Sequence, residues 1–161
     1  MLLELPAWEL KYRVEDLLAR YTHCIDSDQL ESWPALFTDA CRYQVIAKEN
    51  ADRKLPISAF YCDSRAMLVD RVVSLRHANI YERHGYRHLV SSLLIHAVTA
   101  TEVTASSHYA VFRTRTNGAT EIYQTGIYQD RITLENGTWL FREKIATFDT
   151  NRIDSLLAIP I

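Results

Sequence analysis

Residues 101–149 read TEVTASSHYAVFRTRTNGATEIYQTGIYQDRITLENGTWLFREKIATFD and contain no proline. Two Asn-Gly dipeptides, at 117–118 and 136–137, separate runs that are rich in Val, Ile, Thr, Tyr and Phe. Asn-Gly is a strong hairpin signal, because a type I′ turn needs a positive φ at both of its central residues. Together with the similar run before it, this stretch predicts four long antiparallel strands, over residues 86–98, 101–115, 120–134 and 139–149.

The two turns also predict a register for the strands. With two-residue loops, Thr116 faces Ala119, and counting back from the second turn places Ile132 opposite Phe141. One face of the sheet then carries ten residues that we expect in the core: Val103, Tyr109, Val111, Ile122, Tyr128, Ile132, Leu134, Trp139, Phe141 and Ile145.

The same register places Asp130 opposite Glu143 on the core face. Directly opposed like charges destabilise a sheet unless something compensates them. One interpretation is an acid–base pair whose pKa values an apolar pocket pushes apart. The other is structural: an arginine such as Arg71 or Arg76 neutralises both carboxylates, or a bulge at Gly126 breaks the register. We prefer the structural interpretation, because ion-pair networks perturb pKa values as active sites do.

The first half of the chain predicts helices. Apolar residues with a spacing of 3.6 form one stripe that ends before Asp26: Leu10, Val14, Leu17, Leu18, Tyr21 and Ile25. Further along we expect a short helix at Ser32-Trp33-Pro34, a strand at Cys41–Ala47, a charged loop at Lys48–Pro56, and a third helix capped by Asp63 or Ser64. Helices followed by a meander predict one α+β domain over residues 1–161, with a curved antiparallel sheet wrapped around the helices.

Composition narrows the function classes. The chain has 161 residues, is 48% hydrophobic, and contains four prolines and four glycines, which is typical of one folded domain. Its net charge of −2 gives no strong field for nucleic acid or an anionic membrane, so we expect neither as a partner. We expect no signal peptide and no membrane span, because the sequence has neither a basic n-region nor a long apolar run.

Three cysteines, at positions 24, 41 and 62, are widely spaced and odd in number. This pattern favours reduced thiols and a cytoplasmic location. None of them belongs to a C-x-x-C or C-x-H pair, so the sequence predicts neither a Rieske cluster nor a zinc site of the usual type in this chain.

Residues 78–92, ANIYERHGYRHLVSS, concentrate polar and titratable groups. His84 and His88 have the i, i+4 spacing of helical metal ligands, but Gly85 and the strand-like residues that follow disfavour a helix. On a strand the two rings stand about 13 Å apart and cannot share one metal ion. Tyr and Arg are enriched at the hot spots of protein interfaces, so this stretch favours a recognition surface.

The end of the sequence is apolar. After Asp154 it reads SLLAIPI, without a charged side chain. We expect this segment to fold onto its own domain or to be buried against a partner.

Several stretches together resemble one known family, the small (beta) subunits of aromatic-ring-hydroxylating Rieske dioxygenases. They are IDSDQLESWPALFTDACRY at 25–43, ANIYERHGYRHLVSS at 78–92, TGIYQDRI at 125–132, NGTWLFREKIATFDT at 136–150, and the tail DSLLAIP. The stretch at 78–92 looks most like the beta subunits of terephthalate-, anthranilate- and salicylate-type oxygenases, which act on carboxylated rings. It departs from the naphthalene-type pattern, with which it shares Arg87-His88-Leu89.

This resemblance implies the cone-shaped α+β fold of nuclear transport factor 2, ketosteroid isomerase and scytalone dehydratase. It also implies that a large (alpha) subunit holds a Rieske 2Fe-2S cluster and a mononuclear iron. The beta subunit of this family holds no cofactor and forms a trimer in an α3β3 assembly. Our candidates for contact with the large subunit or with a neighbouring beta chain are six residues: Tyr81, Arg83, His84, Tyr86, Arg87 and His88.

Three functions remain open at this point. The first is a non-catalytic structural subunit, in which each of the six candidates contacts a partner or, alternatively, forms a local salt bridge to a residue such as Glu82 or Asp70. The second is a self-sufficient isomerase or dehydratase that uses Asp130 or Glu143 as the base. The third is a plain ligand-binding or scaffold module.

Overall fold

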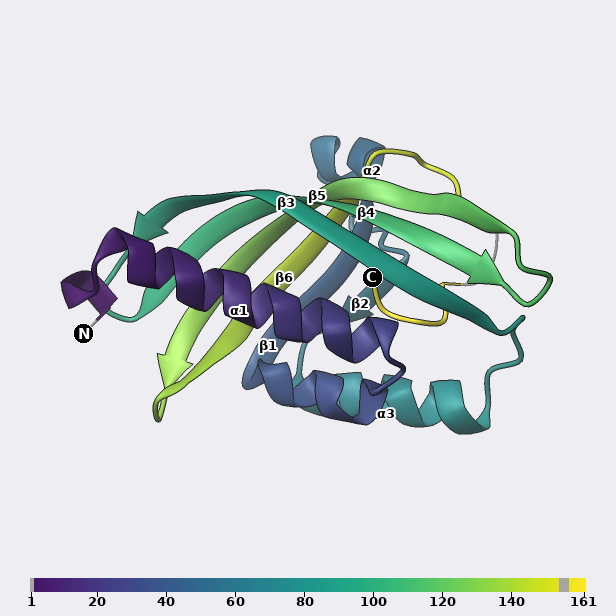
Figure 1. Ribbon diagram of the computed structural model, residues 1–161, viewed down its shortest axis with the longest axis horizontal. Helices are drawn as coiled ribbons and strands as arrows, with labels where there is room; N and C mark the ends of the chain where they lie inside the picture. Colours follow the sequence, from purple (N-terminus) through teal and green to yellow (C-terminus); the bar gives the residue numbers. More distant parts are fainter. Residues whose placement is uncertain (1, 154–156) are drawn as a thin grey trace.

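The computed structural model describes residues 2–153 and 157–161, and four consecutive long strands in the second half of the chain form the predicted meander (Figure 1). They are β3 (His84–Val98), β4 (Glu102–Arg115), β5 (Thr120–Glu135) and β6 (Thr138–Phe148). In the second turn Asn136 and Gly137 have φ values of 50° and 80°, as a type I′ turn requires. The strand prediction is confirmed to within a few residues at each end.

The first turn is one residue longer than predicted. Gly118 has a φ of 85°, and Arg115 N–H donates to the Ala119 carbonyl across a three-residue loop. Thr114 therefore pairs with Thr120, and the prediction that Thr116 faces Ala119 is wrong. A bulge between Val111 and Phe112 restores the predicted register further along the two strands.

The sheet contains two further strands, and it is mixed. Its strand order is β2-β1-β6-β5-β4-β3, in which β1 (Phe37–Ala47) lies parallel to β6 and β2 (Phe60–Cys62) lies antiparallel to β1. The α+β prediction holds, but the expectation of an entirely antiparallel sheet is wrong at β1. The neighbour of β1 in the sheet is β6, which is the last strand of the meander and runs in the same direction as β1. A parallel pair of this kind needs a long connection, and here the connection includes the rest of the meander.

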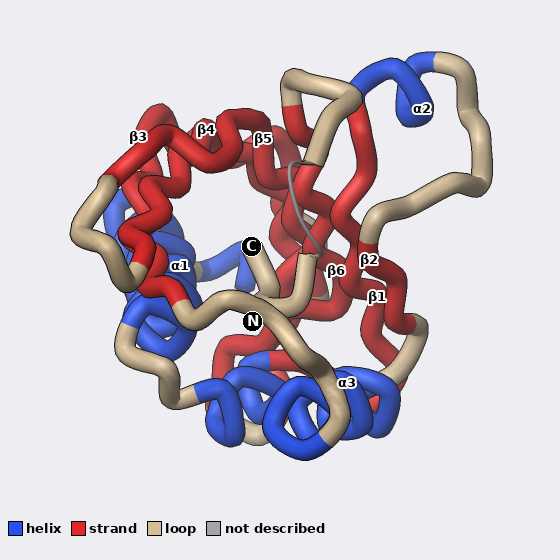
Figure 2. Tube along the Cα trace, turned by 90° about the vertical axis from the view of Figure 1, so that its right-hand side faces the viewer, coloured by secondary structure: helices blue, strands red, loops and turns tan. Residues whose placement is uncertain are grey.

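The helices follow the predicted apolar pattern. They are α1 (Ala7–Asp26), α2 (Lys48–Asp52), α3 (Arg65–His77), and two 3-10 helices at Leu2–Glu4 and Leu30–Leu36. The Ser64 hydroxyl caps α3 by accepting from Met67 N–H at 3.3 Å. The segment predicted as a charged loop begins with α2. The helices α1 and α3 lie inside the curve of the sheet (Figure 2).

The core lies between these helices and the sheet. Seven of the ten predicted core residues are buried, whereas Ile122 is 66% exposed, Leu134 is 39% exposed and Ile145 is half-buried. Bulges explain the exceptions at Ile122 and Ile145, because each extra residue turns the following side chains to the opposite face of the sheet. Leu134 lies beside the second turn, one residue before the last paired residue of β5.

The apolar tail folds onto its own chain. Residues 157–161 are buried, and they lie between the helices and the sheet (Figure 2). The Tyr43 hydroxyl accepts from Ile161 N–H at 2.9 Å, and the Tyr21 hydroxyl donates to the Ile161 main-chain oxygen. Asp154, Ser155 and Leu156 lie outside the described residues.

Candidate functional site

A pocket of about 520 Å³ opens where the end of α1, the end of α3, the start of β3 and the tail meet. The segment between α3 and β3 forms one rim, because α3 ends at His77 and β3 begins only at His84. Four of the six predicted contact residues line this pocket: Tyr81, Arg83, His84 and Tyr86. The structure thus brings together most of the residues that the sequence singled out.

Arg87 and His88 take opposite directions on β3. Arg87 is exposed, whereas the side chain of His88 is completely buried. His88 Nδ1 lies 2.6 Å from Asp26 Oδ1, and His88 N–H donates to Asp26 Oδ2 at 2.9 Å. Asp26 therefore fixes the end of α1 to the start of β3. Sequence reasoning missed this role and treated Asp26 only as the end of a helix.

His84 is half-buried, and its ring packs against two tyrosines. Its centroid lies 5.8 Å from that of Tyr81 and 4.8 Å from that of Tyr86. Nδ1 donates to the Glu82 carbonyl at 2.8 Å, because a carbonyl oxygen can only accept. Burial lowers the pKa of the His84 imidazole, so the ring is neutral at pH 7.

The prediction that His84 and His88 lie on a strand is confirmed. Within residues 2–153 and 157–161, no three His, Cys, Asp or Glu side chains are grouped so that they could hold a metal ion. The two histidines instead bond to different groups, a backbone carbonyl and the carboxylate of Asp26.

Charges around the pocket are unevenly compensated. Arg76 bonds to Glu31 at 2.7 Å and to Asp28 at 2.8 Å. Arg83 and Arg87, by contrast, make no hydrogen bond or ion pair with any described residue and are exposed. The alternative of a local salt bridge is not found at Arg83 or Arg87, and Glu82 bonds to Arg115 at 2.8 Å instead. The alternative does hold in kind for His88, whose partner is Asp26 and not Glu82 or Asp70.

The predicted pairing of Asp130 with Glu143 is wrong. A bulge between Arg131 and Ile132 shifts the register by one residue, so Asp130 pairs with Lys144 and Glu143 pairs with Arg131. This bulge lies closer to the Asn136-Gly137 turn than the bulge at Gly126 that the structural interpretation allowed.

Both carboxylates have cationic partners, but not the predicted arginines. Lys144 Nζ lies 3.0 Å from Asp130 Oδ1, and Arg42 lies 2.8 Å from Glu143. The guanidinium of Arg71 stacks on the Phe60 ring instead, and Arg76, at the rim of the pocket, pairs with Glu31. The structural interpretation was right in kind and wrong in its residues.

Lys144 and Asp130 form a closed pair inside the core. Their side chains are 0% and 1% exposed, and Lys144 Nζ lies 3.7 Å from the centroid of the Tyr128 ring. Burial raises the pKa of Asp130 and lowers that of Lys144, while their mutual attraction opposes both shifts. Asp130 and Glu143 both line a further pocket of about 500 Å³, but the Asp130 side chain is almost fully buried and is paired with Lys144. Asp130 is therefore not available as the base of the isomerase alternative.

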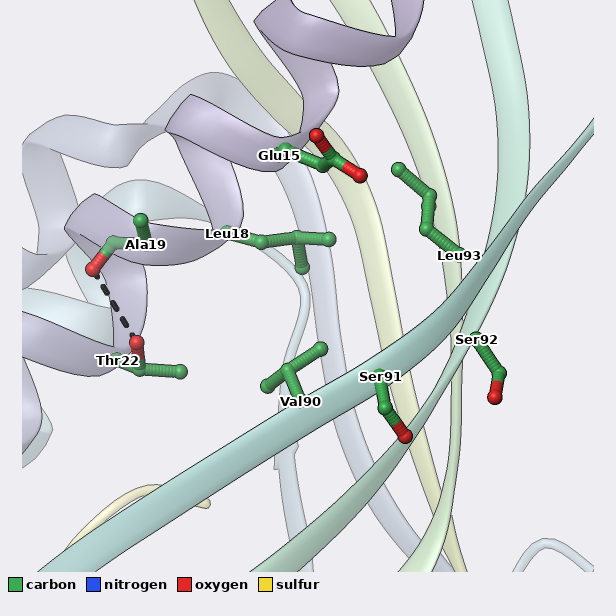
Figure 3. Close-up of a pocket in the computed structure, with 8 residues that line it drawn as sticks. All are labelled: Glu15, Leu18, Ala19, Thr22, Val90, Ser91, Ser92 and Leu93. Atoms are coloured by element: carbon green, nitrogen blue, oxygen red, sulfur yellow. Dashed lines mark hydrogen bonds between the residues drawn. The ribbon is translucent and has the colours of Figure 1, made fainter.

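A second pocket, of about 320 Å³, lies between α1 and the bulged part of β3 (Figure 3). Glu15 and Leu18 of α1 and Val90 of β3 point into it, and Thr22 donates to the Ala19 carbonyl on its rim. This pocket contains none of the predicted contact residues.

The thiols offer no nucleophile. Cys24, Cys41 and Cys62 are free and buried, and burial raises the pKa of each to about 11. The thiolate, which is the reactive form, is therefore scarce at pH 7. Among the described residues, no helix has the length and apolar character needed to cross a membrane.

Comparisons with known proteins agree with this geometry. Residues 7–144 match the model of the SnoaL-like domain. The chain is 42% identical over 158 residues to the small subunit of anthranilate 1,2-dioxygenase from Burkholderia cepacia, covering 98% of this chain and 96% of the relative. It is 41% identical over 143 residues to a beta subunit of the terminal oxygenase component of terephthalate 1,2-dioxygenase from a Comamonas species, covering 89% and 93%.

A solved structure gives the same answer in three dimensions. The beta subunit of an aromatic-ring-hydroxylating dioxygenase from Novosphingobium aromaticivorans superposes with a TM-score of 0.89 at 46% identity, covering 96% of this chain and 99% of that one. The predicted cone-shaped α+β fold and the family resemblance are both confirmed. This chain belongs to the SnoaL-like domain family and, within it, to the small (beta) subunits of aromatic-ring-hydroxylating dioxygenases.

Proposed function

We propose that this chain is a non-catalytic subunit that supports and orients the large, iron-containing subunit of an oxygenase acting on a carboxylated aromatic ring. The observation that carries the proposal is the similarity to dioxygenase small subunits along 98% of the chain. Two of the relatives are named for anthranilate and terephthalate, and both compounds carry a carboxylate on the ring. We propose that residues 1–161 act as one domain in this role.

The redox chemistry is assigned to the partner. A Rieske centre needs two cysteines and two histidines, and a mononuclear iron of this class needs two histidines and a carboxylate. The three cysteines here are buried and far apart in sequence, and His84 and His88 bond to other groups. The donor set does not fit either centre, so we place the Rieske 2Fe-2S cluster and the mononuclear iron on the large subunit.

The contact surface is assigned to the stretch 80–88. Tyr81, Arg83 and Arg87 are accessible enough to contact a partner directly, and Arg83 and Arg87 lack partners within the described chain. His84 and Tyr86 line the adjoining pocket. His88 acts from inside, by holding β3 against Asp26.

The family resemblance supports a beta trimer within an α3β3 assembly. It also supports a cytoplasmic location, with neither nucleic acid nor membrane as a partner. The near-neutral net charge of −2 and the three free thiols agree with these assignments.

Purification and turnover test the functional assignment. The chain alone should be colourless, should show no oxygenation of anthranilate or terephthalate, and should sediment at about three times its mass of 18.6 kDa. Mixed with its cognate large subunit, it should form a brown, active complex. Turnover by the chain alone, or failure to bind the large subunit, would contradict the proposal.

A further inference from the structure

The pocket at the start of β3 has an apolar floor. Ile25 of α1, Leu75 of α3, Tyr86 of β3 and Ile159 of the tail are each no more than 7% exposed, and all four line it. Four separate segments thus build one apolar surface. The tail contributes because Tyr43 holds its end, through the hydrogen bond from Ile161 N–H.

The rim of this pocket carries one charged side chain that has no hydrogen-bonding or ion-pair partner among the described residues. The carboxylate of Asp26 accepts hydrogen bonds from His88, and that of Asp28 pairs with Arg76. Arg76 also binds Glu31, which lies outside the pocket. Arg83 is therefore the one charged side chain lining the pocket that has no partner among the described residues.

An apolar side chain stands exposed beside that charge. Ile80 is 97% exposed, the highest value among the large hydrophobic residues of the described chain. Isolated exposed apolar residues are common, but this one lines the same pocket as Arg83. Apolar surface, an unpaired arginine and a concave floor occur together here, and this combination is typical of an interface hot spot.

We propose that this pocket is a socket for one segment of the large subunit, which places an aliphatic or aromatic side chain on the apolar floor and a carboxylate against Arg83. The inference rests on the proposed function and adds the chemistry of the docking segment. A volume of about 520 Å³ accommodates one large side chain with its flanking backbone. A carboxylate matches Arg83, because a guanidinium binds it through two parallel hydrogen bonds.

The test is a binding titration of the cognate large subunit against variants of the full chain. Arg83→Glu and Ile80→Ser should each raise the Kd at least tenfold, because one reverses the socket's free charge and the other removes its apolar rim. Both side chains are exposed, so neither substitution should disturb folding. Lys54→Glu is the matched control: Lys54 is also exposed and unpaired, but it lies outside the pocket, and its Kd should stay within twofold.

Arg87→Glu separates the socket from the wider interface, because Arg87 is exposed on β3 but does not line the pocket. If Arg87→Glu weakens binding while Arg83→Glu and Ile80→Ser do not, the interface at 80–88 stands and the socket is wrong. If the unmodified chain binds and none of these variants changes the Kd, both the socket and the interface are wrong, and the subunit assignment stands. If the unmodified chain does not bind at all, the proposed function and the socket fall together.

Discussion

Two polar regions of this molecule differ in how completely their charges are satisfied. In the core, Lys144 and Asp130 neutralise each other, and aromatic rings surround the ammonium group. At the start of β3, Arg83 and Arg87 are exposed and have no partner in the described chain. Both regions attract attention in the sequence, but only the second offers unused interactions. Unsatisfied groups, and not polarity alone, indicate where a partner binds.

The largest expected effect is on folding stability and tests the buried Lys144–Asp130 pair. Lys144→Met leaves the Asp130 carboxylate buried without its partner, and breaking a buried pair in this way costs about 3–5 kcal/mol of folding free energy. Urea denaturation followed by circular dichroism measures the loss. The double variant Asp130→Leu/Lys144→Met should recover much of it, since no charge is then left in the core. Full stability of the single variant would show that the pair is not closed as described.

The second largest effect is also on folding stability, and it tests how Asp26 holds the start of β3 through His88. Asp26→Ala removes the acceptor of two hydrogen bonds from His88 and should cost about 1–3 kcal/mol, because buried donors are left unsatisfied. Asp28→Ala is the control: it removes an exposed pair with Arg76 and should cost about 0–1 kcal/mol. Equal losses in the two variants would mean that Asp26 does not anchor β3.

A smaller effect on stability is expected at the exposed arginines near the start of β3. Arg87→Glu should change the free energy of unfolding by no more than about 0.5 kcal/mol, because its side chain makes no contact that folding requires. The same variant should bind the large subunit more weakly in size-exclusion chromatography. If Arg87→Glu destabilises the fold but binds the large subunit normally, Arg87 has a structural role and is not a contact residue.

The smallest effect concerns pH. The folded-state pKa of His84 is lowered by burial, so below its ordinary value of 6.5 the unfolded chain binds more protons than the folded chain. The contribution of His84 to stability is complete above pH 6.5 and is lost as the pH falls. The difference in stability between pH 7 and pH 5 should therefore be smaller in His84→Gln than in the unmodified chain. An unchanged difference would contradict a half-buried ring whose pKa is lowered in the folded chain.

Much of the fold could be predicted from local sequence signals. The second Asn-Gly turn, the four long strands and the stripe on α1 follow from backbone preference and periodicity. The parallel pairing of β1 with β6 could not be predicted in this way, because no turn connects those two strands. Strand β2 has only three residues, too few for a detectable pattern.

The site was predictable only in part. The density of Tyr, Arg and His at 78–92 located the stretch, and Gly85 correctly separated it from a helical metal motif. The bulge between Arg131 and Ile132 has no sequence signal, and a shift of one residue was enough to replace Glu143 with Lys144 as the neighbour of Asp130. Asp26 was missed because its partner is 62 residues away in the chain.

Hydrogen–deuterium exchange of the chain, alone and bound to its cognate large subunit, tests the central claim most directly. Residues 80–83 lie outside the helices and strands, so their amides should exchange rapidly in the free chain, whereas Ala78 and Asn79 N–H already donate to the Ser74 carbonyl. In the complex we expect strong protection at 80–83 and at the start of β3, with little change at the pocket between α1 and the bulged part of β3. Protection confined to other surfaces, with 78–89 exchanging as in the free chain, would contradict the account.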